Sequence, residues 1–208
     1  CCTPKLEEFI RKYNQNVTDI SSTINTDTYK PAYKDPQKPL VIGWSGSHST
    51  SRYLHLLDDV LIKLSAQISF TLKVIGDSEF RIPGVKVEAK AWELDTEVEE
   101  LQEIDIGLYP LPFDEEWVYG KSGLKALQYM SLGIPTIATA IGANFRIIEH
   151  GVNGYLVNTP EEWIEHIIKL CNDTEMYDQM RHSARQSVLE GYSLKSNNKV
   201  YLSILEDH

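Results

Sequence analysis

Basic residues are scarce in this chain of 208 residues. Its 20 Lys and Arg residues stand against 30 Asp and Glu residues, which gives a formal net charge of −10 at pH 7. Proteins that bind nucleic acids or anionic membranes usually present a basic face, so this composition argues against a nucleic-acid partner. Any phosphate group that the protein binds must be held locally, by a few well-placed groups.

Cysteines and long apolar runs are also few. Cys1, Cys2 and Cys171 show no spacing typical of metal ligands or disulfides, which fits a reducing, cytoplasmic compartment. No apolar run approaches the ~18 residues of a transmembrane helix, and no signal peptide is recognisable. Because the chain begins with Cys1 rather than Met, we expect it to be a piece of a longer protein.

What the sequence does contain is a regular alternation of short apolar runs and amphipathic segments. The runs predict strands at 40–46, 69–77, 84–92, 104–111, 134–140 and 154–157, with a further short strand at 17–22. Helical spacing of apolar residues predicts helices at 4–16, 52–67, 97–102, 121–132, 144–150, 161–171, 174–190 and 192–205. Unbroken apolar strands alternating with helices indicate an α/β fold, a Rossmann-like parallel sheet with helices on both faces.

Proline marks a boundary early in the chain. Residues 30–39 contain three prolines among polar residues, a composition typical of a stiff linker between domains. We therefore divide the chain into the tail of an amino-terminal domain with its linker (1–38), a Rossmann-like domain (39–190) and a carboxyl-terminal helix (191–208).

The first candidate phosphate site is "GWSGSHSTSR", residues 43–52, which follows the first strand of the predicted domain. Gly43 and Gly46 allow a ligand to approach the backbone closely, the serines supply small donors, and Arg52 could reach a phosphate with two hydrogen bonds. The stretch matches neither G-x-G-x-x-G nor a Walker loop. Taken alone, the stretch is better explained as a Ser-rich turn with a helix cap.

The second candidate is "GKSG", residues 120–123, at the start of a predicted helix. Free amides and the positive end of the helix dipole attract anions there. Lys121 adds a full charge, and Lys125 follows one turn later. Both candidates lie where parallel sheets bind ligands, at the carboxyl ends of strands, so the sequence predicts a diphosphate between them.

Five stretches of the sequence together resemble a known family. They are "LVIGWSGSHSTSRYL", "VIGD", "DIGLYPLP", "YGKSGLKALQYMSLGIPTIATAIGAN" and "IIEHGVNGYLV". Their order and spacing resemble the carboxyl-terminal, donor-binding domain of group 1 (family 4) retaining glycosyltransferases, over roughly residues 20–208. The resemblance implies one half of a GT-B architecture, whose substrate is a nucleotide-diphosphate sugar.

The resemblance also implies an activity and partners. A hexosyltransferase-like enzyme would transfer a sugar from the nucleotide sugar to an acceptor hydroxyl with retention, in polysaccharide or glycolipid assembly. The acceptor glycan or lipid would bind through an amino-terminal domain missing from this chain, so the fragment is expected to be inactive alone. Peripheral membrane association of the full-length protein is compatible with such a role.

Residue roles follow from the same resemblance. It implies diphosphate contacts at Gly46, Ser47, Arg52, Lys121, Ser122 and Gly123, ribose and base contacts at Gln128 and Trp92, and donor-sugar contacts at Glu116 and Gly120. The family usually has an Arg where Ser47 stands, and glutamates where Gly120 and Gln128 stand. Lys121 is expected to restore the missing positive charge. No catalytic residue is assigned.

No metal is predicted, because the rim loops contain no Asp-x-Asp and the chain no His/Cys cluster. We likewise expect no cofactor besides the nucleotide-sugar substrate. The absent glutamates leave open a non-catalytic nucleotide-sugar-binding module, and a nucleotide-sugar epimerase shares the same architecture. A response-regulator receiver is disfavoured, since it needs acidic residues after the first strand, where this chain has Gly-Ser-His-Ser at 46–49.

Overall fold

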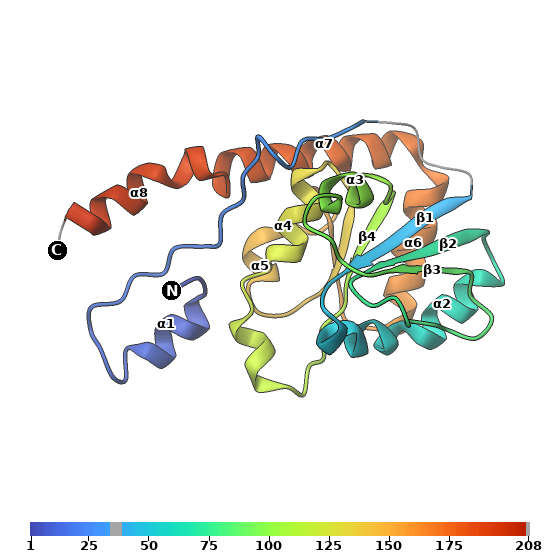
Figure 1. Ribbon diagram of the computed structural model, residues 1–208, viewed down its shortest axis with the longest axis horizontal. Helices are drawn as coiled ribbons and strands as arrows, with labels where there is room; N and C mark the ends of the chain where they lie inside the picture. Colours follow the sequence, from blue (N-terminus) through green and yellow to red (C-terminus); the bar gives the residue numbers. More distant parts are fainter. Residues whose placement is uncertain (34–38, 207–208) are drawn as a thin grey trace.

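A six-stranded parallel sheet forms the centre of the molecule (Figure 1). The computed structural model describes residues 1–33 and 39–206. The strands are β1 (Leu40–Ser45), β2 (Phe70–Ile75), β3 (Val87–Lys90), β4 (Ile106–Tyr109), β5 (Thr136–Thr139) and β6 (Tyr155–Val157). Their order is β3-β2-β1-β4-β5-β6 with every neighbouring pair parallel, which confirms the predicted Rossmann-like fold. The chain order reverses between β1 and β4, where such sheets bind ligands.

Helices surround this sheet. They are α1 (Pro4–Ile10), the 3-10 helix η1 (His48–Leu57), α2 (Asp58–Ser65), α3 (Glu97–Gln102), the 3-10 helix η2 (Glu116–Gly120), α4 (Leu124–Ser131), α5 (Asn144–Ile147), α6 (Pro160–Asn172), α7 (Thr174–Gly191) and α8 (Leu194–Glu206). Figure 1 shows α8 extending away from the sheet, on the same side of the molecule as α1. None of the described helices combines the length and the hydrophobicity required to cross a bilayer.

Consecutive residues of one strand fill two separate cores. Ile137 of β5 belongs to a cluster that includes Leu61 of α2 and Ile167 of α6. Ala138, the next residue, belongs to a second cluster with Leu127 of α4. Successive side chains of a strand point to opposite faces, so α2 and α6 cover one face and α4 covers the other. Burial on both faces explains why the strands read as unbroken apolar runs.

The helix predicted at 52–67 has a different beginning from the one expected. The chain first forms the 3-10 helix η1 from His48 and continues as α2 only after residue 57. Hydroxyl groups bond to the backbone in this first part: Thr50 Oγ1 donates to the Ser47 carbonyl over 3.0 Å and Ser51 Oγ to the His48 carbonyl over 2.8 Å. Such bonds compete with the α-helical pattern.

The strand predicted at 17–22 is wrong. These residues form no regular element. In the described part of the chain, their backbone pairs with that of the first residues at Cys1 alone, where the Cys1 amino group donates to the Thr18 carbonyl and the Ile20 amide to the Cys1 carbonyl, each over 2.8 Å, and a single residue does not make a partner strand. Within the proline-rich stretch 30–39, residues 34–38 lie outside the described part. The division into domains at these positions stays a prediction.

Residues 23–33, here called the crossing segment, run along α7 before the sheet begins (Figure 1). Arg185 of α7 holds this segment in place. Its Nη1 donates to the Tyr29 carbonyl over 2.8 Å and to the Ser131 carbonyl of α4 over 2.8 Å, and its Nη2 donates to the Thr26 carbonyl over 3.0 Å. Tyr29 is thereby fixed between α7 and α4.

Candidate functional site

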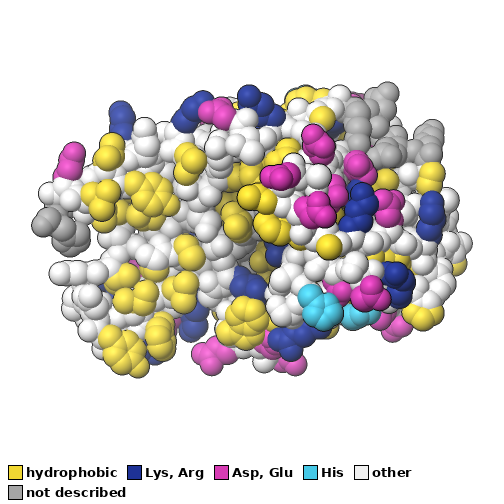
Figure 2. Space-filling view, in the orientation of Figure 1, with side chains coloured by type: hydrophobic (Ala, Val, Ile, Leu, Met, Phe, Trp, Pro, Cys, Tyr) yellow, Lys and Arg dark blue, Asp and Glu magenta, His cyan; other side chains and the backbone are white. Residues whose placement is uncertain are grey.

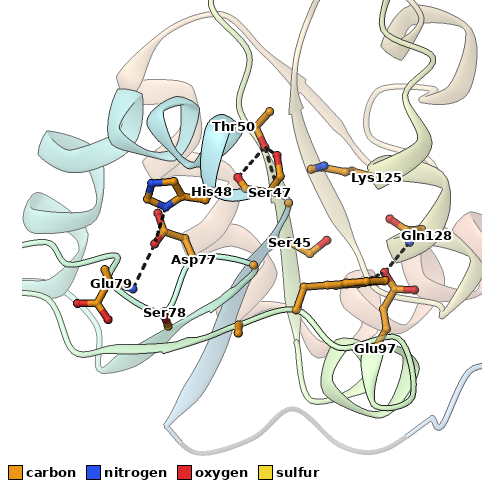
Figure 3. Close-up of a pocket in the computed structure, with 14 residues that line it drawn as sticks. Ser45, Ser47, His48, Thr50, Asp77, Ser78, Glu79, Glu97, Lys125 and Gln128 are labelled. Carbon is orange, nitrogen blue, oxygen red and sulfur yellow. Dashed lines mark hydrogen bonds and ion pairs between the residues drawn. The ribbon is translucent and has the colours of Figure 1, made fainter.

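A cavity of about 680 Å³ lies at the carboxyl ends of β1, β2 and β3 (Figure 3). The described residues that line it come from the loops after these strands and from α3 and α4: Ser45, Gly46, Ser47, His48, Thr50, Gly76, Asp77, Ser78, Glu79, Ala91, Trp92, Glu97, Lys125 and Gln128. This position beside the β1–β4 reversal is the one at which open parallel sheets bind ligands.

The loops after β1 and β2 meet backbone to backbone at this cavity. The Gly46 amide donates to the Ile75 carbonyl over 2.9 Å. A Cβ on Gly76 would lie 1.8 Å from the Gly46 carbonyl oxygen, and Gly76 has a φ of +114° that side chains rarely adopt. The close approach brings the start of η1, at His48, to the cavity wall. In this first turn the Ser47 amide donates to Thr50 Oγ1 over 3.1 Å, and the Thr50 and Ser51 amides donate to the Ser47 carbonyl. The His48 and Ser49 amides are the ones placed to donate to a ligand.

A negative charge occupies one side of the cavity. Asp77 accepts hydrogen bonds from Ser51 Oγ over 2.6 Å and from the Glu79 amide over 3.2 Å, and its carboxylate lies 3.2 Å from His48 Nδ1. These contacts, the Ser51 hydroxyl first among them, hold the pKa of Asp77 below its usual value. In Figure 3, Asp77 and Glu79 lie across the cavity from Lys125 and Gln128. An anionic ligand group is therefore favoured on the α4 side.

The helix α4 begins three residues later than the sequence predicts, at Leu124. Gly123, its N-cap, has a φ of +74°, and this left-handed residue turns the chain into the helix. Lys121 precedes the turn in an extended conformation, with φ −68° and ψ 135°. Lys121 and Lys125 therefore do not share a helical face, although four residues separate them.

Tyr129 fixes α4 against the sheet. Its side chain is completely buried, and its hydroxyl oxygen accepts a hydrogen bond from the Ser45 amide over 2.7 Å. Gly107 of β4 leaves room for the ring, since a Cβ there would lie 2.6 Å from it. Residues three apart lie on the same face of a helix, so this seating brings Lys125 and Gln128 together to the cavity.

Lys125 is a half-buried cation at the end of β1. Its Nζ lies 5.8 Å from the ring centroid of Trp44, which is itself buried. Burial lowers the pKa of Lys125 to about 8, assisted by the charge of Lys121 and opposed by the carboxylate of Glu97. A lysine in such a place changes its charge readily when an anion arrives.

Glu97 of α3 accepts hydrogen bonds from three different parts of the chain: the loop after β3, the helix α4 and the crossing segment. Its Oε1 accepts hydrogen bonds from Trp92 Nε1 over 2.8 Å and from Gln128 Nε2 over 3.2 Å, and its Oε2 accepts one from the Tyr29 hydroxyl. Gln128 Nε2 also donates to the Tyr29 oxygen over 3.1 Å. Burial and the bond to Glu97 raise the pKa of Tyr29 to about 12, so this hydroxyl remains a donor.

A second group of side chains, here called the rim cluster, lies beside the cavity at η1 and η2. Glu115 Oε2 accepts from Tyr53 Oη over 2.7 Å and from Trp117 Nε1 over 2.6 Å, and it pairs with Arg52 Nη2 at 3.0 Å. The hydrogen bond from Tyr53 is the main reason that the pKa of Glu115 is lowered. Lys121 Nζ lies 4.1 Å from the ring centroid of Trp117, a cation–π contact.

Lys121 also faces an apolar hollow of about 630 Å³ between α1 and η2. Hydrophobic side chains gather over α1 and the neighbouring part of the molecule in Figure 2. Those lining the hollow include Leu6, Phe9 and Trp117, together with Gly120.

The structure places the predicted site residues at four locations. Gly46, Ser47, Trp92 and Gln128 line the cavity. Arg52 and Lys121 belong to the rim cluster, Glu116 and Gly120 line the apolar hollow, and Ser122 and Gly123 form the turn into α4. Their roles toward a ligand stay predictions.

Three residues of the cavity and its surroundings, Glu97, Asp77 and Tyr29, carry no recognisable signal in the sequence. Lys125, in contrast, lies three residues before Gln128, and residues three apart share a helical face. The sequence could therefore have predicted that Lys125 lies beside Gln128 in the site. No local pattern joins Gln128 to Glu97, 31 residues away, or to Tyr29, 99 residues away. Among the described residues, no group of three or more His, Cys, Asp or Glu side chains is arranged to hold a metal ion.

Comparisons with known proteins agree with this architecture. Residues 39–173 match the family model described as Glycosyl transferases group 1. A sucrose synthase from Melioribacter roseus is 34% identical over 88 residues, which are 39% of this chain and 11% of that protein. A glycosyltransferase structure from Rickettsia africae has a TM-score of 0.74 at 20% identity, covering 99% of this chain and 63% of the other. The structure of Anabaena HepE in complex with UDP and glucose has a TM-score of 0.74 at 19% identity, covering 97% and 60%.

This chain therefore spans less than two thirds of the length of each of these three proteins. The matched family segment includes all six strands and every described residue that lines the cavity. It also covers well over half of the 208 residues. The chain belongs to the Glycosyl transferases group 1 family.

Proposed function

We propose that this chain binds a nucleotide-diphosphate sugar in the cavity and that the protein transfers the sugar to an acceptor hydroxyl with retention. The observation that carries the proposal is the shape and polarity of the cavity. It lies at the carboxyl ends of β1 and β2, with the first turn of η1 on one wall and donors and acceptors from α3 and α4 on the other. A solved relative of the same fold, Anabaena HepE, contains UDP and glucose, which supports the same ligand class here.

The donor would lie along the cavity with its parts in a fixed order. The nucleobase packs on Trp92, which is 47% exposed and held by its bond to Glu97. The ribose lies at Gln128, and the diphosphate lies at Gly46 and Ser47. The sugar extends toward the rim cluster and the predicted contacts Glu116 and Gly120, with Arg52, Lys121, Ser122 and Gly123 near the leaving phosphate.

In the transfer step, the bond between the anomeric carbon and the β-phosphate oxygen breaks and a bond to the acceptor oxygen forms on the same face. The acceptor proton passes to the departing phosphate, which takes the electron pair of the broken bond. No metal is predicted, so cationic side chains and helix dipoles offset the developing charge. The acceptor, a glycan or a lipid, binds to the remainder of a longer, cytoplasmic protein, which associates peripherally with a membrane when the acceptor is a lipid.

Isothermal titration of the chain with UDP, GDP and their glucose conjugates tests the donor site. We expect saturable binding of one nucleotide series. The variant Ser47→Trp, which fills the cavity at an exposed position of the loop, should abolish it, while Lys63→Met, on the exposed side of α2, should not change it. Absence of binding by the folded chain to every nucleotide would refute the proposed donor site.

A non-catalytic nucleotide-sugar-binding module is the second candidate. It is favoured by the absence of a carboxylate at Gly120 and Gln128, where the resembling enzymes usually have glutamates. Incubation of the full-length protein with donor and acceptor separates the two functions, because only the transferase forms a glycosylated acceptor. Release of an epimerised nucleotide sugar without acceptor would identify an epimerase instead.

A further inference from the structure

Lys125 lines the cavity, and no described carboxylate contacts its ammonium group. It is the only Lys or Arg among the described residues that line the cavity. Within residues 1–33 and 39–206, no acceptor or carboxylate lies within bonding distance of its Nζ, whose contact is the face of Trp44. Removing an ammonium from water without an anionic partner is costly. The position therefore suits the anionic part of a ligand.

Charged groups face Lys125 from several elements. Glu97 on α3 and Lys121 before α4 act on it in opposite directions, and Asp77 and Glu79 lie across the cavity. Arg52, the other cation expected to meet a phosphate, already pairs with a carboxylate of the rim cluster at 3.0 Å. Lys125 thus remains the free positive charge among the cavity residues described.

Glu97 and Gln128 offer hydrogen-bond acceptors to a ligand about one helical turn from Lys125. The three donors on Glu97 use part of a carboxylate's capacity of about four hydrogen bonds. Gln128 uses its amide nitrogen toward Glu97 and Tyr29, which leaves its oxygen as an acceptor. Two adjacent hydroxyl groups, as in a ribose, match two adjacent acceptors. The three residues from 125 to 128 rise about 4.5 Å along the helix, comparable to the step from a ribose to its phosphate.

We propose that Lys125 binds the diphosphate and that Glu97, together with Gln128, binds the ribose hydroxyls of the nucleotide donor. This inference rests on the proposed function. It gives a role to Glu97, which the sequence left without one, and it makes Lys125 rather than Arg52 or Lys121 the main cation of the diphosphate site. The carboxylate for the ribose comes from α3 rather than from α4, where Gln128 stands. The cation comes from inside α4 rather than from the glycine-rich loop after β1.

Titration calorimetry with UDP and GDP, whichever binds, tests the diphosphate contact. Lys125→Met should weaken binding by about 10- to 100-fold, the range expected for loss of a charge-assisted hydrogen bond. Lys125→Arg should restore most of the affinity, and Lys63→Met serves as the matched control. Because the pKa of Lys125 is lowered to about 8, an anion bound at pH 8 should also drive uptake of about half a proton. Repeating the titration in buffers of different ionisation enthalpy measures this uptake, which Lys125→Arg should abolish.

Sugar discrimination tests Glu97. The unmodified chain should prefer the ribonucleotide over its 2′-deoxy analogue, and Glu97→Gln should reduce that ratio toward 1 with little change in melting temperature. If the chain binds nucleotide but Lys125→Met behaves like Lys63→Met, and the ribose preference survives Glu97→Gln, this inference is wrong while the donor site stands. If the unmodified chain binds no nucleotide, the proposed function itself fails.

Discussion

Removing one oxygen atom from Tyr129 should destabilise the whole domain. The ring is completely buried, and its hydroxyl accepts the Ser45 amide hydrogen bond at 2.7 Å. Ser45 is only 4% exposed, so water cannot replace the lost acceptor in Tyr129→Phe. Leaving a buried amide unpaired costs about 1–3 kcal/mol.

The assay is urea unfolding followed by circular dichroism, with calorimetric melting as a second measurement. For a chain of this size the loss corresponds to a melting temperature lower by about 2–12 °C. Tyr13→Phe is the matched control, since Tyr13 is 79% exposed and its change should stay within about 0.5 kcal/mol. Equal midpoints for the two variants would show that Tyr129 does not link α4 to β1 through this bond.

Three further perturbations address the loops, the crossing segment and the buried cation. Gly76→Ala should reduce the unfolding free energy by more than Gly84→Ala. Both glycines have a positive φ, but a Cβ at Gly76 would lie 1.8 Å from the Gly46 carbonyl oxygen, whereas the space at Gly84 is open. Equal urea midpoints for the two variants would contradict this. Arg185→Met removes hydrogen bonds to three backbone carbonyls, so limited proteolysis should cut the crossing segment faster, and an unchanged cleavage rate would count against its anchoring role. The pKa of Lys125 falls from 10.5 to about 8 on folding, so the unfolded chain binds more protons between these values and stability should rise with pH there. Relative to Lys125→Met, the unmodified chain should gain about 1–2 kcal/mol between pH 7 and 9.5 in urea unfolding, and no relative gain would refute the shift.

Much of the fold could be predicted because its signals are local. Unbroken apolar strands between amphipathic helices need only neighbouring residues to be recognised, and burial of the sheet on both faces produces that pattern. The strand at 17–22 failed for the complementary reason, since β-propensity has no effect without a strand to pair with. The 3-10 geometry of η1 also escaped prediction, although the hydroxyls that favour it are visible in the sequence.

The parallel α/β fold and the glycine-rich turns at the ends of its strands could be predicted from the sequence, because both depend on residues close together in the chain. Which charges face the cavity depends instead on how the chain folds. Gly123 turns the chain before α4, so Lys121 meets Trp117 while Lys125 enters the cavity. Folding also brings Glu97 to Gln128 across 31 residues, and such a meeting depends on how helices pack on the sheet rather than on any spacing along the chain.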